Sequence, residues 1–259
     1  MKLSTGRPVW YQPLDHKNAS LYMLPWHADP STTSSICMSA PAMDYVTDIG
    51  MLNGGRVDSW NTARNPGMGM AYFTKEDMPY YHALADQFTI GDHYHQSTLT
   101  QTCPNRLHLF SGSNGLSVGQ VPFLDNSEPN PGHTWVTVAE VLEAANISWK
   151  TYQQEDNFDD NGNAWFANFQ KAKPGDPLYD KGMFRGVDFV SDFAKDVLAD
   201  NLPQVSWLVG PANLSEHATY HPSAGEDLTA RLLKALAANP AVYAKTAFLF
   251  NYDEGGQFL

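Results

Sequence analysis

The chain has 259 residues, 42% of them hydrophobic, which is enough to bury a substantial core in one large domain or two small ones. A formal net charge of −12 and a pI near 5.0 argue against a nucleic-acid-binding surface, and no basic stretch would hold an anionic membrane. No apolar run is long enough to span a bilayer, and residues 1–8 lack the apolar core of a secretory signal peptide.

The first quarter of the sequence carries turn-forming residues rather than a helix or strand period. Residues 1–65 are rich in Pro, Ser, Asp and Gly, which predicts largely irregular structure with short strands. Within them, residues 53–56 (Asn-Gly-Gly-Arg) suit a tight turn, and we expect a hairpin there. Residues 75–85 then predict a helix, followed by a short strand over residues 87–90.

Two further helices are predicted in the middle of the chain. A loop through Thr102 leads to Pro104, a residue favoured in the first turn of a helix, and apolar positions continue that helix to Gly112. Thr137 and Glu140 have the spacing of a capping box, which predicts the start of the next helix.

The C-terminal half alternates strands and helices. Residues 147–152 and 204–209 predict strands. Leucines over residues 228–236 form a helical stripe that residues 239–240 (Asn-Pro) end, and the apolar run 246–251 predicts a buried strand. This order predicts an α/β fold with a mixed, mostly parallel sheet flanked by helices.

Two adjacent carboxylates, Asp253 and Glu254, follow the last predicted strand directly. Ligands of open α/β sheets collect outside the carboxyl ends of strands, and the glycines that come next free the backbone to turn sharply. The pair is therefore a candidate site for a divalent metal ion.

A second candidate site lies just before Pro104. The hydroxyl of Thr102 would lie among the unpaired N–H groups of a helix start, where a phosphate is stabilised. Asn105 and Arg106 could donate hydrogen bonds to the same phosphate oxygens. The alternative is that Thr102 merely caps the helix, a role for which Thr is well suited.

The two cysteines, Cys37 and Cys103, make neither a disulfide framework nor a zinc site, although a single bridge between them stays open. Cys103 could instead be a thiol nucleophile with His93 or His95 as its base, but nothing in the spacing fixes that geometry.

A third polar cluster, residues 215–217 (Ser-Glu-His) with His221 and Glu226, follows the predicted strand 204–209. A carboxylate and imidazoles beyond a strand end could bind metal or transfer a proton. A polar surface loop is the alternative.

Residues 156–163 resemble the start of a calcium-binding loop, but the twelfth position of such a loop, counted from Asn157, is Asn168, where an EF-hand needs a bidentate Glu. We interpret them as a solvated turn that helps to shape a cleft. The remaining histidines are expected to be structural: His16, His27, His82, His108 and His133.

These segments, in this order, resemble the bacterial phosphocholine-type phospholipase C family, which is grouped with acid phosphatases in a phosphoesterase superfamily. The resemblance covers almost the whole chain, and the order of the motifs is more specific than any one of them. The matching segments are residues 70–77, 81–86, 88–95, 102–106, 155–161, 202–207, 215–217 and 252–254.

The resemblance implies an alkaline-phosphatase-like core and metal-assisted hydrolysis of phosphatidylcholine-like phosphodiesters or small phosphoesters. Thr102 matches the position of the family's nucleophile, which forms a phospho-enzyme intermediate, and Asn105 matches a phosphate-contacting residue. The cofactor would be a divalent metal ion, which neutralises phosphoryl charge. Together, residues and resemblance predict a catalytic group of Thr102, Asn105 and His217, a substrate-binding group of Asn105, Arg106 and Glu216, and a metal-binding pair of Asp253 and Glu254.

The sequence also departs from the family pattern. The family's opening Glu-Asn-Arg-Ser-Phe segment, which supplies further metal ligands, would lie before residue 1, and the family continues beyond Leu259. Ile49 stands where the family has a histidine. We therefore expect residues 1–259 to form a partial catalytic domain with weak metal binding and little activity. The competing hypothesis is a non-catalytic phosphoester- or lipid-binding fragment, or the product of a split gene. The resemblance implies a secreted or periplasmic protein.

Overall fold

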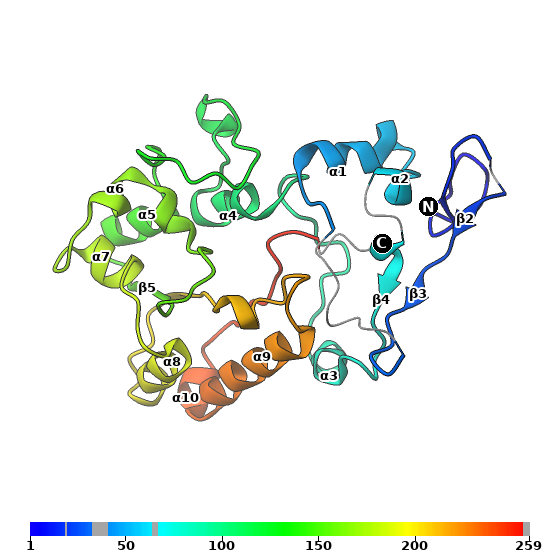
Figure 1. The fold of residues 1–259 in the computed structure, drawn as a ribbon. Helices are drawn as coiled ribbons and strands as arrows, with labels where there is room; N and C mark the ends of the chain where they lie inside the picture. Colours follow the sequence, from blue (N-terminus) through cyan, green and yellow to red (C-terminus); the bar gives the residue numbers. More distant parts are fainter. Residues whose placement is uncertain (19, 33–40, 64–66, 256–259) are drawn as a thin grey trace.

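The central element of the fold is a pair of parallel strands, β5 (Trp149–Tyr152) and β6 (Val205–Leu208), with Trp149 opposite Val205 and Tyr152 opposite Leu208. The computed structural model describes residues 1–18, 20–32, 41–63 and 67–255 (Figure 1). Both strands fall within the ranges that the sequence predicts, so this part of the parallel sheet is confirmed.

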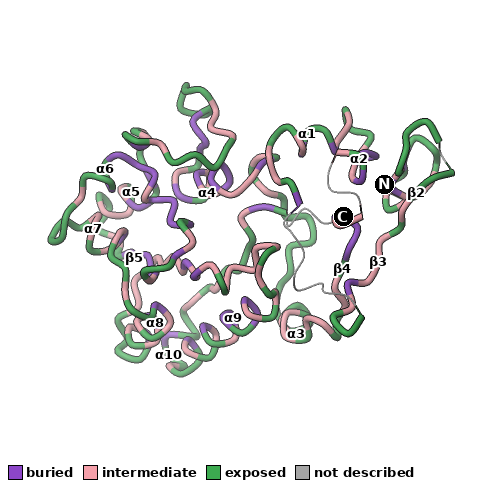
Figure 2. The backbone as a smooth tube through the Cα atoms, in the orientation of Figure 1, coloured by how far each residue is buried: buried purple, intermediate pink, exposed green. Residues whose placement is uncertain are grey.

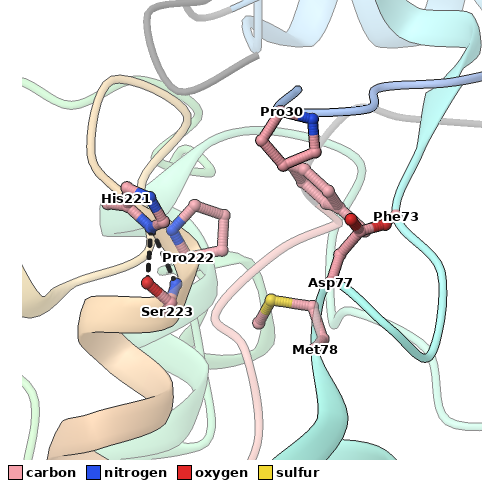
Figure 3. Close-up of a pocket in the computed structure, with 7 residues that line it drawn as sticks. All are labelled: Pro30, Phe73, Asp77, Met78, His221, Pro222 and Ser223. Carbon is pink, nitrogen blue, oxygen red and sulfur yellow. Dashed lines mark hydrogen bonds between the residues drawn. The ribbon is translucent and has the colours of Figure 1, made fainter. Parts of the chain in front are cut away.

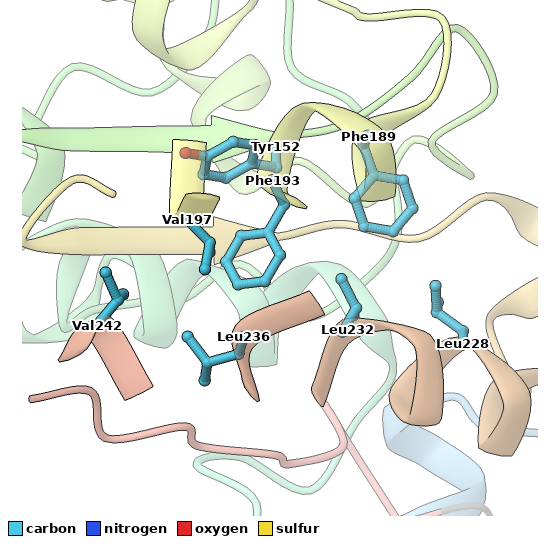
Figure 4. Packing of buried hydrophobic residues seen from close by; sticks show 8 residues of the cluster. All are labelled: Tyr152, Phe189, Phe193, Val197, Leu228, Leu232, Leu236 and Val242. Carbon is cyan, nitrogen blue, oxygen red and sulfur yellow. The ribbon is translucent and has the colours of Figure 1, made fainter. Parts of the chain in front are cut away.

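Helices cover both faces of the β5–β6 pair. Side chains alternate along a strand, so Trp149 faces one helical layer and Tyr152 the other. Trp149 packs with Leu107 of α4 (Thr102–Ser111) and with residues of α5 and α6. Tyr152 packs with Phe193, Leu232 and other residues of α8, α9 and α10 (Figure 4). In Figure 2 the buried stretches gather on α4, α6 and β5 and along α8 and α9. The α/β class is thereby confirmed in its coarse form.

The helices of this region are set by local sequence. At the start of α5 (Val138–Ala144), the Thr137 side chain accepts from Glu140 N at 3.1 Å and Glu140 Oε2 accepts from Thr137 N at 2.9 Å, which confirms the capping box. The leucine stripe lies on α9. The other helices here are α6 (Ala167–Lys171), α7 (Pro177–Gly182), α8 (Phe189–Leu198), α9 (Pro222–Ala237) and α10 (Pro240–Tyr243).

The N-terminal elements lie on the opposite side of the molecule from α5–α8 (Figure 1). Two small strand pairs occur there: β1 (Gln12–Pro13) pairs antiparallel with β2 (Tyr22–Met23), and β3 (Trp26–His27) pairs parallel with β4 (Ala71–Tyr72). The helices here are α1 (Tyr45–Leu52), α2 (Trp60–Ala63) and α3 (Pro79–Gln87). The 3-10 helices among the described residues are η2 (Asn53–Gly55), η3 (Met68–Met70), η4 (Leu116–Val118), η5 (Gly162–Trp165) and η6 (Ala212–Leu214).

Several predictions of local structure are wrong. Residues 246–251 form no strand, and Leu249 is 87% exposed, because this run makes no ladder with the free edge of β6, which pairs with β5 alone among the described residues. Gln87 ends α3, and residues 88–90 form no strand. Residues 53–56 continue α1 as η2, with Gly54 at φ 66°, rather than turning a hairpin.

The loop 156–163 is less solvated than the sequence suggests. Asn157 and Asn161 are 2% and 1% exposed, and the Asn161 amide donates to Gly182 O at 2.7 Å. The loop does help to shape a cleft, because Phe158 and Asp160 line it. Among the helices of the described ranges, none is long and apolar enough to cross a membrane.

Candidate active site

A cleft of about 540 Å³, part of it open to solvent, brings together residues that are far apart in the sequence. The chain after α10 runs back across the molecule to the start of α4 (red in Figure 1), which carries residues 252–254 to the cleft. The cleft is lined by predicted site residues from three segments: Thr102, Arg106, Glu216, His217, Asp253 and Glu254. Sequence reasoning thus named residues that do lie together.

Thr102 is the first residue of α4, and the residue in the N-cap position is Gln101, with no side-chain capping bond. The alternative that Thr102 merely caps the helix is therefore wrong. Its Oγ1 instead donates to Glu254 Oε1 at 3.3 Å across the cleft. The hydroxyl lies at the positive end of the α4 dipole, where negative charge is stabilised.

Asn105 lies behind the cleft rather than in its lining. It is 4% exposed, and its amide donates to Thr100 O at 2.9 Å and to Gln101 O at 3.2 Å, while its Oδ1 accepts from Thr98 N at 2.9 Å. The side chain therefore fastens the loop that leads into Thr102.

Cys103 is buried, and burial raises the pKa of its thiol to about 12. A thiol with so high a pKa is almost entirely protonated at neutral pH and is a poor nucleophile, which argues against the cysteine alternative. Cys37, the other half of the possible bridge, lies outside the described residues.

Arg106 joins two carboxylates at the back of the cleft. Its Nε donates to Asp253 Oδ2 at 2.9 Å, its Nη2 to Asp160 Oδ2 at 2.9 Å and its Nη1 to Asp160 O at 3.0 Å. Burial raises the pKa of Asp160 to about 7, although Arg106 lowers it. Burial also opposes ionisation of Asp253, yet Arg106 beside it holds the pKa of that carboxyl below its ordinary value.

Glu254 is the least satisfied carboxylate of the cleft. It is 8% exposed, and its Oε2 is buried without a hydrogen-bond partner. Burial and then the neighbouring charge of Asp253 raise the pKa of Glu254 to about 9. An unpartnered carboxylate oxygen beside a second carboxylate and a hydroxyl fits a hard divalent cation, whose preferred ligands are oxygens. The part of the chain that the structure describes holds no group of three or more His, Cys, Asp or Glu side chains arranged around a common metal position.

Residues 215–217 are half-buried and line the cleft, so they are more than a polar surface loop. Both Glu216 oxygens accept hydrogen bonds from tyrosine hydroxyls. The His217 Nδ1 is 3.1 Å from Thr219 Oγ1, and its ring lies edge-on to Phe158, with centroids 5.5 Å apart. Burial lowers the pKa of His217, which favours the neutral imidazole.

The other two members of that predicted cluster lie elsewhere. His221 is the N-cap of α9, where its Nδ1 is 2.6 Å from Ser223 Oγ, and it lines a separate, mostly apolar hollow with Pro30 and Phe73 (Figure 3). Glu226 is 7% exposed and accepts from the backbone N–H of Tyr81 at 2.9 Å.

Sequence reasoning did not single out five residues that also line the cleft: Met43, Phe158, Asp160, Ala218 and Tyr252. Phe158 and Asp160 belong to the loop that resembles a calcium site, so its density of Asp and Asn was a usable signal. Met43 carried no signal, because a single apolar residue in an irregular region has no distinguishing pattern.

Comparison with known proteins shows the family to which the chain belongs. The chain belongs to the Phosphoesterase family, whose match covers residues 1–259. It is 35% identical to the hemolytic phospholipase C of Pseudomonas aeruginosa over 100% of this chain and 38% of that protein. It is 38% identical to the non-hemolytic phospholipase C of the same organism over 99% of this chain and 37% of that protein. It is 34% identical to phospholipase C B of Mycobacterium tuberculosis over 86% of this chain and 46% of that protein. The predicted relation to the phospholipases C is confirmed. The chain spans less than half the length of these relatives.

Proposed function

We propose that this chain carries part of the active site of a phosphoester hydrolase that cleaves phosphatidylcholine-like phosphodiesters. The observation that carries the proposal is the meeting of Thr102 and Glu254 across the cleft, with Oγ1 3.3 Å from Oε1, at the start of a helix. A nucleophilic hydroxyl, an acceptor for its proton and a positively polarised helix end are the parts that phosphoryl transfer needs. The name shared by the relatives, phospholipase C, supports a phospholipid as the substrate.

In the proposed reaction, Thr102 Oγ1 attacks phosphorus, and its proton passes to Oε1 of the ionised Glu254 and from there to the leaving oxygen, whose bond to phosphorus breaks. The backbone N–H groups at the start of α4 stabilise the phosphoryl oxygens. Neutral His217 then serves as the base that activates water, which hydrolyses the phosphocholine diester on Thr102, releases phosphocholine and restores the hydroxyl. Asn105 acts through the loop that holds Thr102. Asp253 and Glu254 would hold a divalent metal ion, which supplies charge neutralisation when bound.

The walls of the cleft favour a cationic headgroup. Phe158 and Tyr252 contribute aromatic rings, and Asp160 contributes a carboxylate. Quaternary ammonium groups bind to aromatic faces and to negative charge. This composition supports phosphocholine over an anionic headgroup. The alkaline-phosphatase-like core and the exported location that the resemblance implies remain predictions.

The competing function is phosphoester or lipid binding without turnover. The observation that favours it is that the described residues hold no group of three or more metal-binding side chains. Binding would use the same helix start and acidic, aromatic cleft, but Thr102 would never become phosphorylated.

The test is hydrolysis of an aryl phosphocholine ester by the 259-residue chain with added divalent cations. We expect release of the aryl alcohol, phosphocholine attached to Thr102 detected by mass spectrometry after acid quenching, and loss of both in Thr102→Ala. Ser97→Ala is the control, because Ser97 is an exposed hydroxyl of the same loop. Ester binding without turnover and without phosphocholine on Thr102 would establish the competing function.

A further inference from the structure

Three segments of the chain meet at the carboxylate of Glu216. The Tyr81 hydroxyl of α3 donates to Glu216 Oε1, and the Tyr252 hydroxyl donates to Glu216 Oε2 at 2.7 Å. The Tyr81 hydroxyl is also 3.1 Å from Thr229 Oγ1 of α9. Each carboxylate oxygen thus accepts a hydrogen bond from a protein hydroxyl.

The backbone around Glu216 is shaped for this arrangement. Glu216 has φ 61°, in the left-handed region that residues other than glycine rarely adopt. Gly225 of α9 faces the carboxylate, and a Cβ there would overlap the Glu216 side chain. Such a conformation persists when the surrounding contacts determine it, which here are the two tyrosine hydroxyls and the gap at Gly225.

We propose that Glu216 is a positioning residue that holds His217 and the Asp253–Glu254 pair at the cleft, and that it does not bind the substrate itself. His217 is the next residue in the chain, so the backbone conformation at Glu216 directs the His217 ring, which lies edge-on to Phe158. Tyr252 precedes Asp253, so its bond to Glu216 fixes the start of that pair. The catalytic roles of His217, Asp253 and Glu254 in the cleft rest on the proposed function.

The first test observes the position of His217 without any reaction. In the wild-type chain we expect a nuclear Overhauser effect between the His217 and Phe158 rings. Tyr81→Phe and Tyr252→Phe each remove a single hydroxyl, and we expect each to weaken this effect, with Glu216→Ala abolishing it. Tyr152→Phe is the matched control, because the Tyr152 hydroxyl donates to Asp196 Oδ2 at the same 2.7 Å, away from the cleft. An unchanged effect in Glu216→Ala would overturn the proposal.

The second test separates positioning from binding of the headgroup. Glu216→Gln keeps an acceptor for one tyrosine but removes the charge. If Glu216 positions His217, kcat falls equally for an aryl phosphocholine ester and for an aryl methyl phosphate without a cation, and KM changes less than twofold. A rise in KM of tenfold or more confined to the phosphocholine ester would show that Glu216 binds the headgroup, and would overturn the proposal.

The two tests also keep this inference apart from the proposed function. A wild-type chain that hydrolyses neither ester would count against the proposed function, while the ring-to-ring effect would still decide the role of Glu216. Turnover of both esters with an unchanged effect in the Glu216 variants would reject the positioning role alone.

Discussion

Arg106 and Asp253 lie 147 positions apart in the chain and form an ion pair with Nε and Oδ2 separated by 2.9 Å. The Arg106 side chain is 20% exposed, and the same guanidinium binds Asp160 through a second nitrogen. Its N–H groups therefore bind protein carboxylates, so Arg106 joins the segments that form the cleft. This structural role is in addition to the substrate-binding role that the sequence predicts.

We expect Arg106→Met to lower the free energy of unfolding by about 3–5 kcal/mol, because it leaves Asp160 and Asp253 buried without their cation. Urea denaturation followed by tryptophan fluorescence measures the change. Arg231→Ala is the control: Arg231 pairs with Asp227 on the exposed face of α9, and such helix pairs contribute at most about 0.5 kcal/mol. Equal losses in the two variants would contradict the central role of Arg106.

We expect Glu254→Gln to stabilise the metal-free chain above pH 5 and to remove its response to divalent cations. The folded-state pKa of about 9 exceeds the ordinary value of 4.5, so the folded chain holds the proton more tightly than the unfolded chain. The stability of the wild type therefore falls as pH rises from the ordinary value toward 9, and the amide removes this dependence. Melting temperatures with and without Mg²⁺ between pH 5 and 9 test both parts. A cation-induced rise that survives in Glu254→Gln would show that the metal binds elsewhere.

A second pH dependence is expected from His133, which is surrounded by the rings of Phe123, Trp135 and Phe166, with centroids 4.3–5.6 Å from its own. Its Nε2 is buried without a partner, and burial lowers its pKa below the ordinary 6.5. The stabilisation from neutral His133 is complete above pH 6.5 and is lost as pH falls through the folded-state pKa.

Replacement of His133 by Phe should therefore flatten the fall in melting temperature between pH 7 and 5. The comparison is His93→Gln, an exposed ring that pairs only with neighbouring Asp92 among the contacts described. A wild-type chain whose melting temperature does not fall across this range would count against the prediction.

Gly225→Ala should have opposite effects in two backgrounds. Alanine in a helix interior is normally favoured over glycine by about 1 kcal/mol. In the native chain the new methyl group meets the Glu216 side chain, so we expect a net loss of stability. In a Glu216→Ala background the obstacle is gone, and the same change should become stabilising. A double-mutant cycle by thermal unfolding measures this reversal of sign. Additive effects would contradict the close packing of the two residues.

Local signals predicted local structure well. The capping box at Thr137 and Glu140, the start of α4 near Pro104 and the leucine stripe of α9 depend on residues within a few turns of one another, and all are present. The helix α1 was missed because its apolar residues carry no clear stripe, although Asp44 caps it through Thr47 N at 3.0 Å.

Predictions that depend on distant partners were less secure. Residues 246–251 have a strand-like composition, but a strand forms only beside another strand, and the sequence does not say which edge is available. The meeting of Thr102 with Glu254 was expected from the resemblance alone, since no spacing rule joins positions 152 residues apart. The hydrogen bonds from Tyr81 and Tyr252 to Glu216 could not be predicted for the same reason.

The charges of Arg106, Asp160 and Asp253 come from a helix, a loop and the segment after α10, and the one cation serves both carboxylates. Loss of the arginine alone leaves two carboxylates without their cation in a place that water reaches poorly. A neutral residue at position 106 becomes tolerable once both aspartates have become neutral, whereas an asparagine at one of them still leaves a one-to-one ion pair. These three positions should accordingly change together during divergence, with the order of the changes constrained by charge.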